Sequence, residues 1–239
     1  MRRERRLLVA GSILMLGFVY LAFEFIAAMA WTDPPYDWAR NFISDLGFSD
    51  CAVVDGDRIC SPLHPLMNAG LLIQGSIFTI GSILVVRLTL PDRTRRLVAG
   101  VPLVLSGVGT FFVGVFHQSL ALYEADLNWL HILAATLAIG AGNIGIVLLG
   151  AFLLRSAEWR WYAIAILIVG IVGLVGSLLL INDIDFGLGI GLIERIAVYP
   201  LNTWTIGTGV GLLVKGARDS VLHGRARRAA AAAPASTAS

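Results

Sequence analysis

The segment NFISDLGFSDC (41–51) is a polar interruption in a very apolar chain. A serine, a histidine and a carboxylate are the residue types of a nucleophilic hydrolase. In such a site Ser44 would be the nucleophile, His131 the base, and Asp45 or Glu194 the group that orients the histidine. The chain carries neither a G-x-S-x-G nor an H-E-x-x-H motif. The sequence therefore favours a binding or structural role over this hydrolase.

A metal-assisted variant of the same chemistry would use three histidines. His64, His117 and His131 would be the ligands, and a carboxylate would activate a bound water. Each histidine also has a structural interpretation, because His64 lies among prolines and the other two lie near the ends of apolar segments. The structural interpretation is preferred, and we predict no metal and no cofactor.

Ionisable and amide side chains within the apolar segments form a further group of candidates. Such residues are costly in a bilayer, so they normally face the bundle interior or a wet cavity. Arg195 is the natural partner for a carboxylate such as Asp45 or Glu24, or for an anionic ligand. The predicted cluster, which either binds a ligand or forms structural bridges, comprises Glu24, Asp45, Asn68, His117, His131, Asp183, Glu194 and Arg195.

The two cysteines lie close together, at Cys51 and Cys60, in one connection between apolar segments. On the outer side of a bacterial membrane the environment is oxidising, which favours a disulfide. A bridge closing a loop of about ten residues would contribute roughly 2.5–3 kcal/mol in the chain-entropy model. The alternative is a pair of free thiols, and the spacing does not resemble a zinc site.

The composition identifies the class of protein. The chain has 239 residues, of which 57% are hydrophobic and 14% charged, whereas soluble domains carry about 25% charged residues. A segment of about 20 apolar residues is long enough to cross a bilayer. Six segments meet this length, and we expect each to be a transmembrane helix: 7–30, 65–86, 97–116, 128–154, 161–181 and 192–214.

The distribution of positive charge predicts the orientation of these helices. Of the 18 Lys and Arg residues, all but Arg40, Arg58 and Arg195 lie at the N-terminus, in alternate connections or after the last segment. Connections rich in Lys and Arg remain on the cytoplasmic side. Both termini are therefore expected in the cytoplasm, and the connection 31–64 outside. The arginines are scattered without interleaved aromatic residues, which argues against nucleic-acid binding.

Several motifs resemble a known family. In chain order they are NFISDLG, SPLHPLMNAGLLIQG, GVGTFFVGVF, His131 at the start of a helix, and GLIERIAVYPLNTW. Over about residues 7–215 this pattern resembles the prokaryotic membrane family called domain of unknown function 998, and more distantly the DRAM- and Sfk-type proteins. The resemblance implies six helices and an outer polar site, without an established reaction. It points to Ser44, Asp45, Gly47, Asn68, His131, Glu194 and Arg195.

The sequence thus predicts an all-α bundle of six transmembrane helices in the bacterial inner membrane. A basic N-terminus (1–6) precedes the membrane domain (7–215), and a disordered basic tail (216–239) follows it. The expected function is binding of a lipid headgroup or small polar ligand in an outer pocket. An outer-leaflet hydrolase and a small-solute transporter are the alternatives. Membrane lipids are the expected partners, and the oligomeric state is left open.

Overall fold

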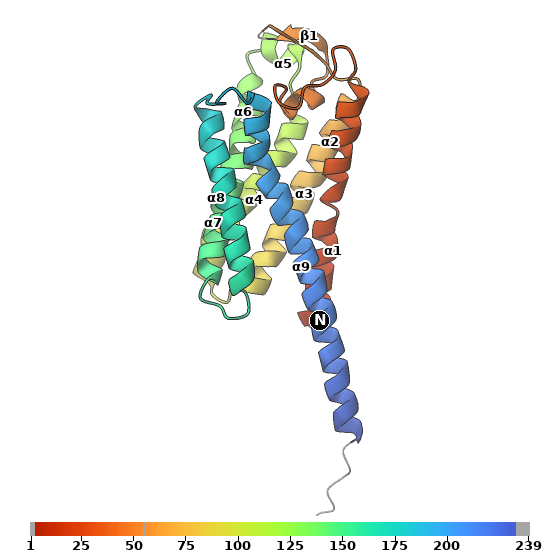
Figure 1. Ribbon diagram of the computed structural model, residues 1–239, viewed down its shortest axis with the longest axis vertical. Coiled ribbons are helices and arrows are strands. Elements are labelled where there is room, and N and C mark those ends of the chain that lie inside the picture. The colour runs from red at the N-terminus through yellow and green to blue at the C-terminus, as the bar shows by residue number, and fades with distance from the viewer. Residues whose placement is uncertain (1–2, 55, 233–239) are drawn as a thin grey trace, which may run out of the picture.

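The structure is a bundle of long helices with a small folded cap at one end (Figure 1). It is a computed structural model that describes residues 3–54 and 56–232. The helices are α1 (Arg3–Met15), α2 (Phe18–Ala30), α3 (His64–Thr89), α4 (Arg93–Val115), α5 (Leu120–Glu124), α6 (Asn128–Thr136), α7 (Gly142–Leu153), α8 (Arg160–Ile181) and α9 (Ile190–Ala232). A 3-10 turn η1 (Ser44–Gly47), a π-helical segment η2 (Leu137–Ala141) and the strands β1 (Cys51–Val54) and β2 (Asp57–Cys60) complete the described elements.

The all-α class is confirmed, and the chain is a multi-pass membrane protein. Within the described residues, five helical stretches are long and apolar enough to cross a bilayer: Arg3–Ala30, His64–Thr89, Arg93–Val115, Asn128–Leu153 and Arg160–Ile181. Helix α9 packs against α1 and α8 in the same bundle, but Glu194, Arg195 and Asn202 make its first half less apolar. The sixth crossing therefore stays a prediction.

Two of the predicted helices are interrupted. The first is divided into α1 and α2 by a turn at 16–17, and the fourth changes from α6 to α7 through the π-helical η2. A π-helical turn leaves backbone groups free for other partners. Asn143 uses this region, since its side-chain amide donates to Ile139 O (3.0 Å) and, on α9, to Ala197 O (2.9 Å).

Small residues allow the helices to pack closely. A side chain added at Gly75 on α3 would overlap the backbone of Gly107 and Phe111 on α4. In lipid, such close approach replaces the hydrophobic driving force that acts between helices in water. The closest approach between these helices therefore depends on small residues at the contact positions.

The connection between α2 and α3 folds over one end of the bundle, and we call its described part (31–54 and 56–63) the lid. The strands β1 and β2 pair antiparallel, with Cys51 opposite Cys60, and these cysteines form the predicted disulfide. Asp50 fastens the hairpin to the start of α5, because its carboxylate accepts a hydrogen bond from Leu120 N (2.8 Å). We call this end of the bundle the loop end.

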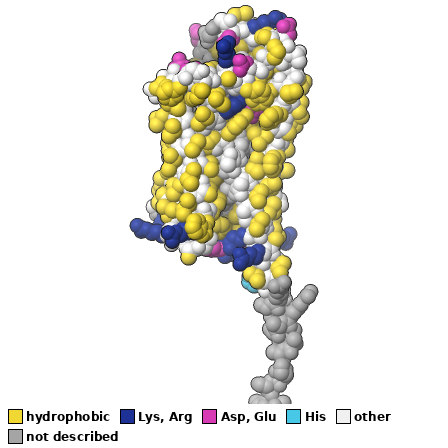
Figure 2. All heavy atoms as spheres, in the orientation of Figure 1, with side chains coloured by type: hydrophobic (Ala, Val, Ile, Leu, Met, Phe, Trp, Pro, Cys, Tyr) yellow, Lys and Arg dark blue, Asp and Glu magenta, His cyan; other side chains and the backbone are white. Residues whose placement is uncertain are grey.

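The opposite end brings together distant parts of the chain. Glu158, between α7 and α8, pairs with Arg3 (2.7 Å) and with Lys215 on α9 (2.8 Å). Figure 2 shows hydrophobic side chains along the flank of the bundle, and Lys and Arg gathered at this end. The start of α1 and the middle of α9 thus lie at the same end, as an even number of crossings requires.

Helix α9 continues through Ala232, well into the segment expected to be disordered. Alanine and arginine are strong helix formers, which accounts for this extension. Residues 1–2 of the expected N-terminal segment and 233–239 of the expected tail lie outside the described residues.

Candidate functional site

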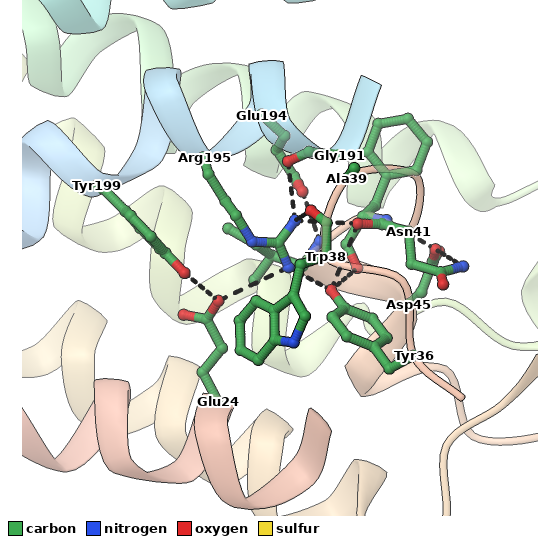
Figure 3. Close-up of polar contacts among 12 residues, drawn as sticks. Glu24, Tyr36, Trp38, Ala39, Asn41, Asp45, Gly191, Glu194, Arg195 and Tyr199 are labelled. Carbon is green, nitrogen blue, oxygen red and sulfur yellow. Dashed lines mark hydrogen bonds and ion pairs between the residues drawn. The ribbon is translucent and has the colours of Figure 1, made fainter. Parts of the chain in front are cut away.

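Arg195 is the centre of the polar cluster at the loop end (Figure 3). It projects from the second turn of α9, and Nη1 donates to Trp38 O (2.9 Å), Asn41 O (3.0 Å) and Gly191 O (2.8 Å). Nη2 donates to the hydroxyl of Tyr36. The guanidinium also lies over the ring of Trp38, 5.0 Å from its centroid. One side chain of α9 therefore holds the first part of the lid.

Glu24 supplies the negative charge beneath this arginine. It is fully buried on α2, and its Oε1 lies 3.9 Å from Arg195 Nη2. The hydroxyl of Tyr199, one turn after Arg195 on α9, donates to the same oxygen (2.8 Å). A buried charge needs a partner and hydrogen bonds to remain ionised. The pair therefore connects α2, α9 and the lid.

Asp45 does not have the partner expected from the sequence. Its Oδ2 accepts from Phe42 N (2.8 Å) and from the Asn41 amide (3.4 Å), within its own turn. The donors of Arg195 are directed at lid carbonyls instead, because Trp38 and Asn41 lie between the two side chains along the lid (Figure 3). The expected Asp45–Arg195 bond is thus replaced by contacts that shape η1.

Burial makes the carboxyl group of Asp45 harder to ionise. The side chain is 5% exposed, and burial raises the pKa of its carboxyl to about 6. The hydrogen bonds from Phe42 N and Asn41 act in the opposite direction without outweighing the burial. Tyr36 is affected similarly, since burial raises the pKa of its phenol, so that it stays protonated while it accepts from Arg195.

Two further contacts fix η1 on the bundle. Glu194 accepts from Ile43 N, and the Asn68 amide of α3 donates to Gly47 O (2.9 Å). A Cβ at Gly47 would overlap the Asn68 side chain. A larger residue at this position would therefore displace the Asn68 amide from its bond to Gly47 O, and both Asn68 and Glu194 bind the lid backbone.

A cavity of about 370 Å³ lies beneath η1. At the loop end, Ser44, His131 and Glu194 line it. Further into the bundle its wall is chiefly apolar, with Gln74 and Asn202 as a hydrogen-bonded amide pair (3.1 Å). The other lining residues are Tyr20, Phe42, Ile43, Leu71, Phe78, Thr110, Val113, Gln118, Ile132, Ala135, Thr136, Ala138, Ile139, Gly140, Ser177, Leu180, Ile181, Val198 and Leu201.

The arrangement does not form the predicted hydrolase triad. Ser44 and His131 line one cavity, but His131 Nδ1 is hydrogen-bonded to Phe116 O (2.9 Å). A backbone carbonyl therefore orients the histidine, and among the described residues no hydrogen bond joins His131 to the carboxylate of Asp45 or Glu194. The predicted triad requires a carboxylate in that role.

Other predicted members of the cluster lie apart from it. Asp183 is exposed in the α8–α9 connection. His117 contacts Gly114 O of the preceding helix (3.4 Å), and His64 opens α3. Among the described residues, no three His, Cys, Asp or Glu side chains are grouped to hold a metal ion. The three histidines of the metal hypothesis are therefore not gathered as ligands.

Sequence reasoning missed the lid residues that receive Arg195. Tyr36, Trp38 and Asn41 lie in the DPPYDWARN segment, which reads as an ordinary polar loop. The available signal was the pair of aromatic residues, because arginine commonly stacks on aromatic rings. Nothing in that signal specifies the two carbonyl acceptors, since backbone groups carry no sequence signature.

Searches among curated proteins and among solved structures find no match. A family model described as Protein of unknown function (DUF998) matches residues 13–211. This range includes the lid, the cavity and the polar residues around Arg195, and it covers most of the chain. The protein therefore belongs to the DUF998 family of proteins of unknown function.

Proposed function

We propose that this membrane protein binds an amphipathic small molecule in the cavity beneath the lid. The observation that carries the proposal is the distribution of side chains along the cavity wall. Polar groups lie at the loop end, and mostly apolar groups line the deeper part. Ligand pockets typically combine an apolar lining with a few convergent polar groups. A molecule with a polar head and an apolar chain matches that distribution.

The depth of the cavity supports the same type of ligand. Glu194 marks its loop end, and Asn202 lies eight residues further along α9. At 1.5 Å per residue this is a depth of about 12 Å. The cavity therefore extends from the level of the lid into the apolar part of the bundle, which an acyl-type chain would occupy.

The wall of the cavity includes residues on the lipid-facing surface. Ile132 of α6 is 53% exposed, and Ile181 at the end of α8 is 70% exposed. Helices α6 and α8 make few direct contacts near the loop end. These features support entry of the ligand from the bilayer, between α6 and α8.

The location follows from the charge distribution. The basic residues that predict a cytoplasmic side lie at the end opposite the lid (Figure 2), where Arg3 and Lys215 share Glu158. On this basis the lid and the cavity face the outer leaflet of a bacterial inner membrane. The disulfide in the lid supports the same orientation, since disulfides persist in oxidising compartments.

Two matched glycine variants test the proposal. Gly140 lines the cavity, and an added Cβ there meets nothing within 4 Å. Gly140→Leu is expected to fill part of the cavity while the bundle stays folded. Gly207→Leu is the control, because Gly207 has equally open space on α9 and does not line the cavity.

The measurement is native mass spectrometry with lipid analysis of protein purified in native lipid particles. We expect a bound amphiphile on the wild type and on Gly207→Leu, and at least tenfold weaker binding, about 1.4 kcal/mol, to Gly140→Leu, measured as a lower occupancy. An empty wild-type protein would contradict the proposal. Equal occupancy of all three proteins would place the ligand elsewhere and would contradict it too.

A further inference from the structure

The charges around the cavity restrict the head group of the ligand. We infer that the cavity selects an amphiphile whose head donates hydrogen bonds and carries no negative charge, such as a long-chain alcohol or amine. This inference rests on the proposed function and adds the chemical class of the ligand. It excludes the phosphate head that Arg195 suggests at first sight.

Glu194 places a carboxyl group at the loop end of the cavity. Among the described residues it is the one Asp, Glu, Lys or Arg side chain in the cavity wall, and it is 8% exposed. One carboxylate oxygen, Oε2, accepts from Ile43 N. The contacts of the described residues assign no donor to the other oxygen, so it remains an acceptor. A head group there meets a carboxyl and no cation.

Arg195 is not part of the cavity wall, and its two terminal nitrogens are already engaged. Its Nη1 is shared among Trp38 O, Asn41 O and Gly191 O, and its Nη2 donates to Tyr36. It also balances the charge of Glu24. Among the described residues its Nε has no hydrogen-bond partner, but the donors on Nη1 and Nη2 could turn to a ligand only by leaving the lid carbonyls without partners. The arginine therefore serves the lid and not the cavity.

His131 adds a second acceptor to the cavity wall. Its Nδ1 is 2.9 Å from Phe116 O. A carbonyl oxygen only accepts, so Nδ1 carries the proton, and Nε2 of the neutral ring is then an acceptor. His131 lines the cavity together with Glu194 and the hydroxyl of Ser44. All three groups can accept hydrogen bonds, and the Ser44 hydroxyl can also donate one, which favours a donor head.

The size of the cavity restricts the rest of the ligand. A volume of about 370 Å³ lies near the lower limit of ligand pockets, which range from about 300 to 1,000 Å³. The space suits one chain of moderate length better than a complete two-chain lipid. Together with the acceptors, this size indicates a single-chain alcohol or amine.

Four probes of equal chain length test the inference. They are 1-dodecanol, dodecylamine, dodecanoate and dodecyl phosphate, each titrated onto the purified full chain and followed by native mass spectrometry. We expect the alcohol, the amine or both to bind at least about tenfold more tightly than either anion. Gly140→Leu should weaken that binding, which assigns it to this cavity. Binding of either anion as tight as that of the alcohol and the amine overturns the inference.

Glu194→Gln separates the two donor heads. The amide oxygen of glutamine can still accept from Ile43 N, so the lid contact is retained. The variant should lose about tenfold in affinity for dodecylamine and change little for dodecanol. An unchanged affinity for both heads overturns the role of Glu194. If none of the four probes binds the wild type, the proposed function itself fails, whereas tight anion binding leaves that function standing and removes only the head-group inference.

Discussion

At the residue scale, Arg195 shows how a buried charge can organise a loop. Its hydrogen bonds go to two backbone carbonyls of the lid and to Tyr36, and its charge is balanced by Glu24. Removal of one partner from a buried ion pair is more damaging than the pair is stabilising, because the remaining charge has no compensation. We therefore expect the lid to stay packed on the bundle only while Arg195 is present.

Substitution of Arg195 should therefore release the lid. We expect Arg195→Ala to lower the free energy of unfolding by about 3–5 kcal/mol, and to expose the lid to trypsin at Arg40, whose side chain is 83% exposed. Arg195→Lys should have an intermediate effect, because an ammonium keeps the charge and cannot reproduce the planar fork. Thermal melting and limited proteolysis in detergent measure both effects.

The exposed Arg218 provides the matched control. Arg218→Ala removes the same charge from α9 outside the cluster, and it should change neither the melting temperature nor the cleavage pattern. A wild-type melting temperature for Arg195→Ala would show that the lid is held by other contacts.

Asp45 should make the lid more stable in mild acid than at neutral pH. Burial raises its pKa to about 6 in the folded protein, against about 3.9 in an unfolded chain. The folded state then binds the proton more tightly, so this group's contribution to stability is complete below about pH 4 and is lost as pH rises to about 6. A shift of this size corresponds to about 3 kcal/mol.

The variant Asp45→Asn isolates this effect, since its side-chain oxygen can still accept from Phe42 N. Melting temperatures of both proteins from pH 4 to pH 7 are the measurement. The variant should gain on the wild type as pH rises to about 6 and stay level above. Parallel curves would mean that Asp45 has an ordinary pKa.

At the element scale, close packing of the helices depends on glycines at the contact positions. Helices α3 and α4 form the most extensive contact of the bundle, and Gly75 lies at their closest approach. The same is true of η1, where Gly47 approaches Asn68. Because lipid offers no hydrophobic driving force between helices, this dispersion contact is a main source of bundle stability.

Gly75→Leu should accordingly separate α3 from α4. Its Cβ would overlap backbone atoms of Gly107 and Phe111, which cannot rotate away. Overpacking of this kind costs about 1–3 kcal/mol or more. Thermal melting compares the variant with Gly207→Leu, where the added side chain meets open space. Equal melting temperatures would show that α3 and α4 can separate without cost.

At the scale of the whole molecule, the two ends of the bundle differ in their charge, and the lid covers one of them. The loop end is covered by the lid with its disulfide, and the opposite end carries the ion pairs of Arg3, Glu158 and Lys215. At that end the hydrogen bonds from Lys215 and Arg3 hold the pKa of the Glu158 carboxyl below its usual value, although burial acts against them. Positive charge at one end is what orients a membrane protein.

The orientation can be tested with two single-cysteine probes, because both native cysteines are joined in the disulfide. Leu188→Cys lies in the exposed α8–α9 connection at the loop end, and Ala157→Cys lies in the exposed connection at the other end. A membrane-impermeant maleimide on intact cells should label the first and spare the second until the cells are opened. The reverse pattern would invert the proposed topology.

The amino-acid sequence alone predicted the apolar helices, the position of the lid, the disulfide and the family. These features depend on composition, on helical length and on motifs, which are local properties of the chain. It also indicated Glu24, Asn68, His131, Glu194 and Arg195 as inward-facing residues, because charged and amide groups in a membrane segment avoid lipid.

Which of these residues meet became known from the folded arrangement of the chain. The partner of Arg195 depends on where α9 begins relative to the lid, so the arginine reaches backbone carbonyls and Glu24 in place of Asp45. The cavity depends on how the lid, α3, α4, α6, α8 and α9 leave a space between them. Backbone acceptors and empty volume carry no residue signature, and both arise only when distant segments pack together.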